Sequence, residues 1–130
     1  MGEQVERGYR ELFEHSAVGM AEVTLQGVFR RVNKMFCQMM ACAEKDLLGL
    51  RFQDITHPDD LEEYIRLVED LVTGVRDRYE LEKRYVRFDN SFLWIHLSVA
   101  VVRDEEGSPL YFVSTMVDIS QRRAGELRLR

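Results

Sequence analysis

The stretch that decides the fold reads FLWIHLSVAVV, from Phe92 to Val102. Apolar residues alternate in it with a second set of side chains, and a period of two is typical of a β-strand whose two faces meet different surroundings. A polar turn follows at 103–109, and a second strand rich in β-branched and aromatic residues runs from Leu110 to Ser120. These strands are expected to form a hairpin that is followed directly by a charged segment at 121–130.

The chain before this hairpin alternates between strand and helix patterns. We expect an amphipathic helix over 1–14 and a charged strand from Asp77 to Arg87. A first hairpin is predicted from Gly19–Leu25 and Val28–Val32, and helices are predicted after the N-cap Asn33, at Glu44–Leu48, at Phe52–Ile55 and from Pro58 to Gly74. Helices between two sets of antiparallel strands predict an α+β domain with the helices on one sheet face.

The longest helix is expected to open at the sequence His57-Pro58-Asp59-Asp60. Proline suits a first helical turn, and aspartates favour the positive end of the helix dipole. Its buried stripe is predicted from helical spacing to comprise Leu61, Tyr64, Ile65, Val68 and Val72.

Bulk properties exclude several classes of protein. The 130 residues suit one domain, and a net charge of −5 argues against a general nucleic-acid surface. No apolar run reaches the roughly 20 residues that a membrane helix needs, and no signal peptide is visible. Cys37 and Cys42 do not make a disulfide framework, so we expect a reducing, cytoplasmic setting.

From about Tyr9 to Ser120, the chain resembles a PAS domain of a bacterial signalling protein. The resemblance is carried by Asn33, Leu48-Gly49, the segment 57–60, Trp94, the segment 103–107 and the closing Asp118-Ile119-Ser120-Gln121-Arg122-Arg123. It implies a five-stranded antiparallel sheet with short helices on one face and a small cavity between sheet and helices.

The same resemblance implies a domain organisation and a role. An N-terminal amphipathic helix would occupy 1–14, the PAS domain 15–120, and the start of a connector helix 121–130. In such proteins the connector leads to a histidine kinase, a diguanylate cyclase or another PAS module. The isolated domain is therefore expected to be a non-catalytic part of a signal-transduction protein.

Alternation assigns the faces of the main hairpin. Leu93, Ile95, Leu97 and Val99 should point towards the helices, with Trp94, His96, Ser98 and Ala100 on the outer face. The predicted cavity set is Phe36, Met39, Phe52, Ile55, Leu97, Phe112, Ser114 and Met116. Apolar sets with one hydroxyl line many small-molecule sites. They also fill ordinary cores, and the sequence allows both interpretations.

The cofactors known in the family that this chain resembles need residues that the chain lacks. A flavin photosensor needs Asn-Cys-Arg where this chain has Arg51-Phe52-Gln53, and haem needs an inward histidine on the long helix. His15, His57 and His96 are scattered and have no metal-ligand spacing. We therefore expect no cofactor, metal or catalytic group, while an unknown small ligand is possible.

Two surfaces are expected to carry the signal. Tyr9, Phe13, Trp94 and His96 are predicted to form a homodimer interface from the first helix and the outer sheet face. Asp118 and Ile119 are predicted to transmit strand movements to the connector, because a carboxylate there can accept from backbone N–H groups at the helix start or pair with an arginine. The simpler interpretation makes Asp118 only a cap.

Three function classes agree with these observations. The leading hypothesis is a regulatory module that binds a small ligand and transmits through a dimer and the connector helix. The alternative is a structural dimerization module with a filled core. A third is a haem or flavin redox or gas sensor.

Overall fold

A five-stranded antiparallel sheet forms the centre of the protein, with the strand order β2-β1-β5-β4-β3. Its strands are β1 (Gly19–Val23), β2 (Phe29–Val32), β3 (Arg78–Val86), β4 (Phe92–Arg103) and β5 (Pro109–Asp118). The computed structural model describes residues 2–129, and side chains for 2–125. Met1 and Arg130, the outer ends of two predicted segments, lie outside the described residues. The predicted α+β fold is confirmed.

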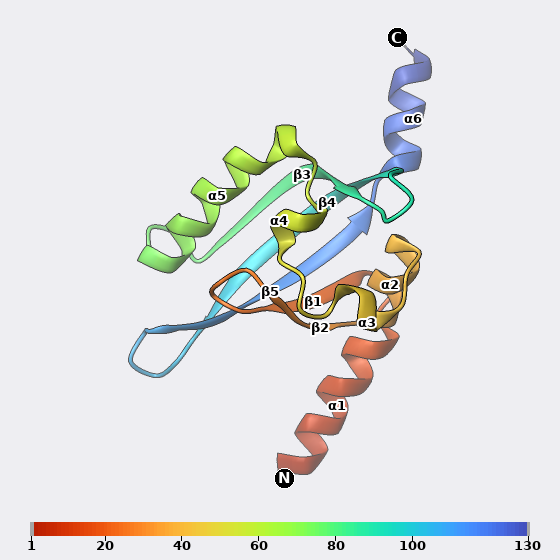
Figure 1. Cartoon of the computed structure of the whole chain (residues 1–130). Coiled ribbons are helices and arrows are strands. Elements are labelled where there is room, and N and C mark those ends of the chain that lie inside the picture. Colours follow the sequence, from red (N-terminus) through yellow and green to blue (C-terminus); the bar gives the residue numbers. More distant parts are fainter. Residues whose placement is uncertain (1, 130) are drawn as a thin grey trace.

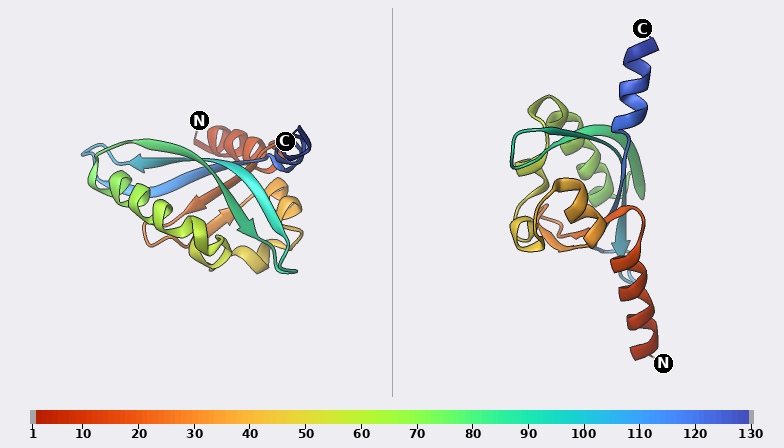
Figure 2. Two further views of the ribbon diagram at one scale, coloured as in Figure 1. Left: turned by 90° about the horizontal axis from the view of Figure 1, so that it is seen from above. Right: turned by 90° about the vertical axis from the view of Figure 1, so that its right-hand side faces the viewer.

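Four helices cover one face of this sheet, and two helices lead away from the body in opposite directions (Figures 1 and 2). The covering helices are α2 (Lys34–Met40), α3 (Glu44–Leu47), α4 (Phe52–Ile55) and α5 (Pro58–Thr73). The projecting helices are α1 (Gly2–His15) and α6 (Ser120–Leu129). Within residues 2–129, no helix combines the length and the apolar character that a membrane crossing requires.

Element boundaries follow the local chemistry of the sequence. The His57 Nδ1 accepts a hydrogen bond from the Asp59 N–H at 3.1 Å, so His57 is the N-cap of α5. Gly74 ends the same helix with φ of 86°, a left-handed conformation that glycine adopts without strain. Ser120 was expected to close the last strand but is the first residue of α6, because its N–H is already bound by Asp118 Oδ1 at 2.9 Å.

The register of the central hairpin confirms the predicted sheet faces. Leu97 pairs with Met116 and Val99 pairs with Ser114, so these side chains share the helix-covered face. Leu93, Ile95 and Leu97 are fully buried there. The outer-face residues of the same strand are only partly buried.

The predicted stripe of α5 is partly wrong. Tyr64 is buried as expected, but Ile65 and Val72 are 43% and 38% exposed. Leu71, which the predicted stripe omitted, is fully buried instead. The helix lies over β3 and β4 at the edge of the sheet, so only a narrow face of it reaches the core. Leu61 and Val68 are half-buried at the margins of that face.

One buried side chain joins three elements at the N-terminal side of the sheet. The Asn33 Oδ1 accepts from Met20 N at 2.9 Å and from Phe36 N at 3.0 Å. The Asn33 Nδ2 donates to the carbonyl oxygens of Phe13 at 2.8 Å and Val18 at 3.1 Å. Asn33 is fully buried, so water cannot replace these bonds. The predicted N-cap of α2 therefore also holds α1 and β1 in place.

We expect Asn33→Ala to lower the free energy of unfolding by about 2–4 kcal/mol, because it strands several buried backbone groups without partners. Urea titration of the purified chain measures the change. Lys34→Ala, at the exposed neighbouring position, is the matched control and should stay within about 0.5 kcal/mol of the wild type. Equal stability of the two variants would contradict the role assigned to Asn33.

Candidate functional site

The predicted cavity residues are brought together between the sheet and the covering helices. All are buried, at 9% exposure or less: Phe36, Met39, Phe52, Ile55, Leu97, Phe112, Ser114 and Met116. Their neighbourhood is rich in aromatic contacts. Phe36 packs against Phe29 and Tyr85 with ring centroids 5.6 and 5.8 Å apart, and the Phe52 and Tyr64 rings are 4.2 Å apart. This space is a packed aromatic core in the described conformation.

A lysine lies in the same core, and it was not part of the predicted set. Lys83 on β3 is fully buried, although its strand looked solvent-facing because of its dense charge. The Lys83 Nζ donates to Thr56 Oγ1 at 3.0 Å, and that hydroxyl donates to the Phe52 carbonyl at 2.7 Å. Period-two alternation was the signal that could have found it, since Tyr79 and Tyr85 are in phase with Lys83 on the inner face.

Aromatic rings surround the Lys83 amine. Its nitrogen lies 3.5 Å from the centroid of the Tyr64 ring and 4.7 Å from that of Tyr85. The Phe52 ring is at 5.8 Å. Such contacts favour the charged ammonium, while removal from water disfavours it.

Burial has the larger effect on the charge of this group. It lowers the pKa of Lys83 well below its ordinary value, and the charge of Asp60 opposes the shift. Burial also raises the pKa of Tyr64 and of Tyr85 well above the usual range for phenols. The core therefore disfavours every charged form inside it, and Lys83 is held there at a cost in stability.

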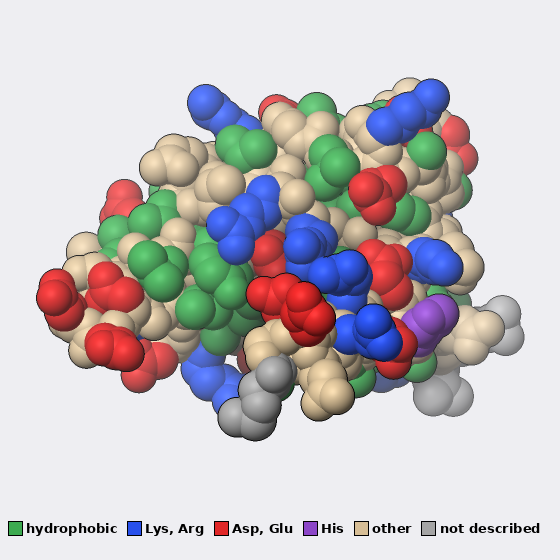
Figure 3. Space-filling model, turned by 90° about the horizontal axis from the view of Figure 1, so that it is seen from below, with side chains coloured by type: hydrophobic (Ala, Val, Ile, Leu, Met, Phe, Trp, Pro, Cys, Tyr) green, Lys and Arg blue, Asp and Glu red, His purple; other side chains and the backbone are tan. Residues whose placement is uncertain are grey.

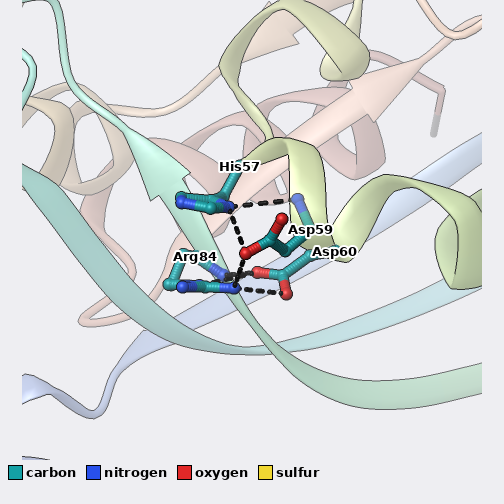
Figure 4. Close-up of polar contacts among 4 residues, drawn as sticks. All are labelled: His57, Asp59, Asp60 and Arg84. Atoms are coloured by element: carbon teal, nitrogen blue, oxygen red, sulfur yellow. Dashed lines mark hydrogen bonds and ion pairs between the residues drawn. The ribbon is translucent and has the colours of Figure 1, made fainter.

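A polar cluster at the start of α5 lies beside this core (Figure 4). The Asp60 carboxylate accepts from the Arg84 backbone N–H at 2.8 Å, from its Nε at 3.1 Å and from its terminal nitrogen at 3.0 Å. Burial alone would raise the pKa of Asp60, but the hydrogen bonds from Arg84 hold it below its usual value. The backbone N–H of His57 donates to the backbone carbonyl of Arg84 at 3.0 Å. These bonds fix α5 to β3 next to Lys83.

The outer face of the sheet holds the start of α6. Glu82 accepts hydrogen bonds from Arg122 and, at 2.8 Å, from Arg123. These bonds hold the pKa of the Glu82 carboxyl below its usual value. The Arg123 guanidinium also stacks on Trp94 at 3.7 Å, and Arg84 lies over the same ring at 5.0 Å. Two arginines thus contact the Trp94 ring, and one of them belongs to α6.

The predicted transmission residues lie at the junction of β5 and α6. Asp118 accepts from the Ser120 N–H, which is the first of the two bonds that the sequence suggested. The Ile119 N–H donates to the Trp94 carbonyl at 3.0 Å, so the junction is bonded to β4 as well. The helix start is therefore tied to the sheet by backbone and side chains together.

The predicted dimer residues have unequal exposure. Phe13 is 1% exposed, because its ring packs inside its own domain, so it is wrong as part of an exposed patch. Tyr9 is 37% exposed, and its hydroxyl donates to Glu22 at 2.6 Å. Burial and this bond raise the pKa of Tyr9 to about 12. His96 lies 3.6 Å from Glu80 on the outer face.

A surface hollow of about 550 Å³ lies between α1 and the first hairpin. Its lining includes the Glu22 carboxylate, which accepts from Arg30 Nε at 3.0 Å and lies 3.7 Å from Arg31. Basic and acidic side chains are intermixed on the side of the molecule from which α1 projects (Figure 3). Arg30 and Arg31 are therefore already paired with Glu22 in this hollow.

The described residues contain no group of three histidine, cysteine or acidic side chains that could hold a metal ion. Cys37 and Cys42 are free and half-buried. Burial raises the pKa of the Cys42 thiol to about 11, which disfavours a reactive thiolate. Phe52, which the sequence predicts at the thiol position of a flavin photosensor, is buried.

A family profile described as PAS domain matches residues 17–121. This chain belongs to the PAS domain family. The fold agrees with a solved PAS domain from Colwellia psychrerythraea, with a TM-score of 0.81 and 17% sequence identity, covering 90% of this chain and 98% of that one.

Two curated relatives of this PAS domain are bacterial signalling proteins. The chain is 37% identical over 121 residues to the probable diguanylate cyclase DgcE of Escherichia coli (strain K12), covering 93% of this chain and 11% of that protein. It is 31% identical over 121 residues to the C4-dicarboxylate transport sensor protein DctS of Rhodobacter capsulatus, covering 91% of this chain and 18% of that protein. The PAS domain thus spans a small part of each relative.

We expect Lys83→Met to raise the free energy of unfolding at about pH 7 by about 1–4 kcal/mol, since it replaces a buried ionisable group by an apolar one of similar length. The pKa of Lys83 is about 10.4 in the unfolded chain and lower than this in the folded chain. At a pH between the folded and unfolded pKa values, unfolding takes up a proton, so the free energy of unfolding of the wild type increases as the pH rises. The gap between variant and wild type should therefore narrow from about pH 7 to about pH 9.5.

Urea titrations at both pH values test this expectation. Tyr64, Tyr79 and Tyr85 have raised pKa values and stay neutral in this window, while Asp60 has a lowered pKa and stays ionised, so these neighbours of Lys83 keep their charge states. Lys45→Met is exposed and serves as the control. A Lys83→Met protein that is less stable than the wild type at both pH values would show that the aromatic contacts outweigh burial.

Proposed function

We propose that this PAS domain is the sensory and regulatory module of a longer signalling protein, of the diguanylate cyclase or histidine kinase type. Its curated relatives support the class of protein. The observation that carries the proposal is the attachment of α6 to the sheet through Glu82 and Trp94. A helix held in this way passes a displacement of the sheet to whatever domain it leads to.

A short path connects the core to the connector. Glu82, Lys83 and Arg84 are consecutive on β3, and they face outward, inward and outward. Glu82 binds α6, Lys83 lies in the aromatic core, and Arg84 joins Asp60 of α5 to the Trp94 stack. A change of charge or packing at Lys83 therefore acts on the residues that hold α6.

The sequence also suggested a path through β5 and Asp118. Ser114 and Met116 lie in the core on that strand, and Asp118 caps the helix start two residues beyond Met116. We propose both paths, because β4 pairs with β3 on one side and with β5 on the other.

We expect Glu82→Ala to release α6 from the sheet, because it removes the acceptor of two arginines. Trp94 is the only tryptophan of the chain, so its fluorescence reports on the stacked Arg123. Emission should shift to longer wavelength, and in a longer protein with an effector domain after α6 the response of effector activity to stimulus should be lost. Glu80→Ala is the matched control, since it faces the same way two residues earlier and contacts Ser98 and His96.

Asp118→Ala separates the two paths. If Asp118 is only a cap, the variant should lose about 0.5–2 kcal/mol of stability and signal normally. If it couples strand to helix, effector activity should shift while the fold is kept. Wild-type signalling by both Glu82→Ala and Asp118→Ala would refute the proposed role of the connector.

We further propose that the domain transmits as a homodimer through α1 and the outer sheet face. Val5 and Leu12 on α1 are 70% and 67% exposed, which is unusual for apolar residues on one helix. Tyr9, Trp94 and His96 remain predicted interface residues, although Tyr9 and Trp94 also have partners in their own chain.

We expect Leu12→Glu to weaken self-association in sedimentation experiments without lowering the thermal stability of the fold. Leu12 is a sharper probe than Tyr9, because a glutamate at position 9 would also face Glu22. Glu14→Gln on the same helix is the control. Wild-type protein that stays monomeric at high concentration would contradict the dimer.

A second candidate function is a structural dimerization module with a filled core. The close aromatic contacts of Phe36, Phe52 and Tyr64 favour it. Native mass spectrometry distinguishes the two candidates, because a ligand-sensing domain carries or accepts a small molecule and a filled one does not.

A further inference from the structure

The Lys83 amine has unused hydrogen-bonding capacity in a place that water does not reach. Its one hydrogen bond among the described residues is to Thr56 Oγ1. An ammonium has three donors and a neutral amine has two, so at least one N–H group is unpaired in either form. An unpaired buried donor of this kind costs stability, and natural proteins keep such costs mainly at functional sites.

A second polar group in this core also lacks a partner. The Tyr79 side chain is 4% exposed, and its hydroxyl has no hydrogen bond with the described residues. The Tyr64 hydroxyl lies near Tyr79, and this proximity contributes to its raised pKa. The Tyr64 and Tyr79 hydroxyls do not, however, have the geometry of a hydrogen bond. Tyr64 contacts both groups, with Lys83 over its ring and the Tyr79 ring edge-on at 5.9 Å.

These observations define what would bind. The free groups are donors, N–H on Lys83 and O–H on Tyr79, so they call for an acceptor with more than one oxygen. The cationic form of Lys83 calls for an anion, because a neutral ligand would leave its charge uncompensated. The walls are aromatic, so the rest of the ligand has to be apolar. A dianion would bring a second charge into the core without a second cation.

We propose that Lys83 is the anion-binding residue of a core site for small monocarboxylates with an apolar tail. The inference rests on the proposed sensory function and gives the class of ligand. A carboxylate oxygen would accept from Lys83, with the Tyr79 hydroxyl as a second donor in the same core. The tail would enter between the rings of Phe52, Tyr64 and Tyr85, which would have to move apart because the core is packed in the described conformation.

Binding would also change the charge state of the core. Burial lowers the pKa of Lys83, and a carboxylate beside it raises that pKa again, so anion binding favours proton uptake by the amine. The new ion pair forms next to Glu82 on the same strand, where α6 is attached. This gives a ligand a direct effect on the connector.

Butyrate and its neutral isostere butyramide are suitable probes for the purified chain, with succinate as the dianion. We expect butyrate to raise the melting temperature in a saturable way, since it binds the folded state, and to bind roughly tenfold or more tightly than butyramide. Calorimetry in buffers of different ionisation enthalpy should show net proton uptake with butyrate. Succinate should bind more weakly than butyrate.

Variants assign the effect to Lys83. Lys83→Met should fold, should lose the preference for butyrate over butyramide, and should take up no proton. Lys45→Met keeps the core intact and should behave as the wild type. Tyr79→Phe removes the second donor and should weaken butyrate binding by a smaller factor than Lys83→Met.

The outcomes separate this inference from the proposed function. If butyramide binds as well as butyrate, and Lys83→Met binds both, the core takes ligands but Lys83 is no anion site, so the inference fails alone. If succinate binds best, the monocarboxylate class is wrong. If no probe binds, the inference is overturned, while loss of signalling in Glu82→Ala would still support the sensory module.

Discussion

The structure depends on the pleat of one antiparallel sheet, because each strand has to present alternate side chains to the core and to the outer surface. In β4 this constraint buries Leu93, Ile95 and Leu97 and turns Trp94 outward. In β3 it leaves no freedom to move a lysine out of the core without turning Tyr79 and Tyr85 the wrong way. Lys83 is thus held inside by the same register that places the tyrosines.

The pleat also links the elements on the inner face of the sheet to those on its outer face. The inner face contacts the covering helices, and the outer face contacts α6 through Glu82 and Trp94. Arg84 contributes to both sides, since its guanidinium pairs with Asp60 of α5 and also lies over Trp94. A sheet that is fixed on both faces at one edge has few ways to adjust to a change in its core. Such a design favours two discrete states over gradual deformation.

Sequence patterns predicted the fold and much of the core, and the failures have physical causes. The alternation from Phe92 to Val102 was clear because one phase, at 93, 95, 97, 99 and 101, holds only Leu, Ile and Val. The other phase contains the polar residues His96 and Ser98. The stripe of α5 was harder, since every turn of that helix carries an apolar residue and only its packing angle decides that Leu71 is buried and Ile65 is not. Phe13 was placed on the surface because the sequence does not reveal that Asn33 binds the end of α1.

Lys83 shows the limit of charge as a guide to exposure. The five charged residues of β3 indicate a solvated strand by composition, and only phase with Tyr79 and Tyr85 indicates otherwise. The partners that make its position tolerable are Thr56, at the end of α4, and Tyr64 of α5, both earlier in the chain. Local sequence patterns do not reveal long-range partners of this kind, so the buried position of Lys83 was seen only in the folded structure.

The opposite directions of α1 and α6 have a geometric consequence for any chain that continues through both (Figure 2). Modules joined by such helices lie one after another in a row. The number of residues in the joining helix sets the rotation of one module relative to the next. Each residue added to a continuous helix turns the next module by about 100° and moves it by about 1.5 Å. The length of the joining helix therefore determines, independently of the core, which face of the next module is turned towards its neighbour.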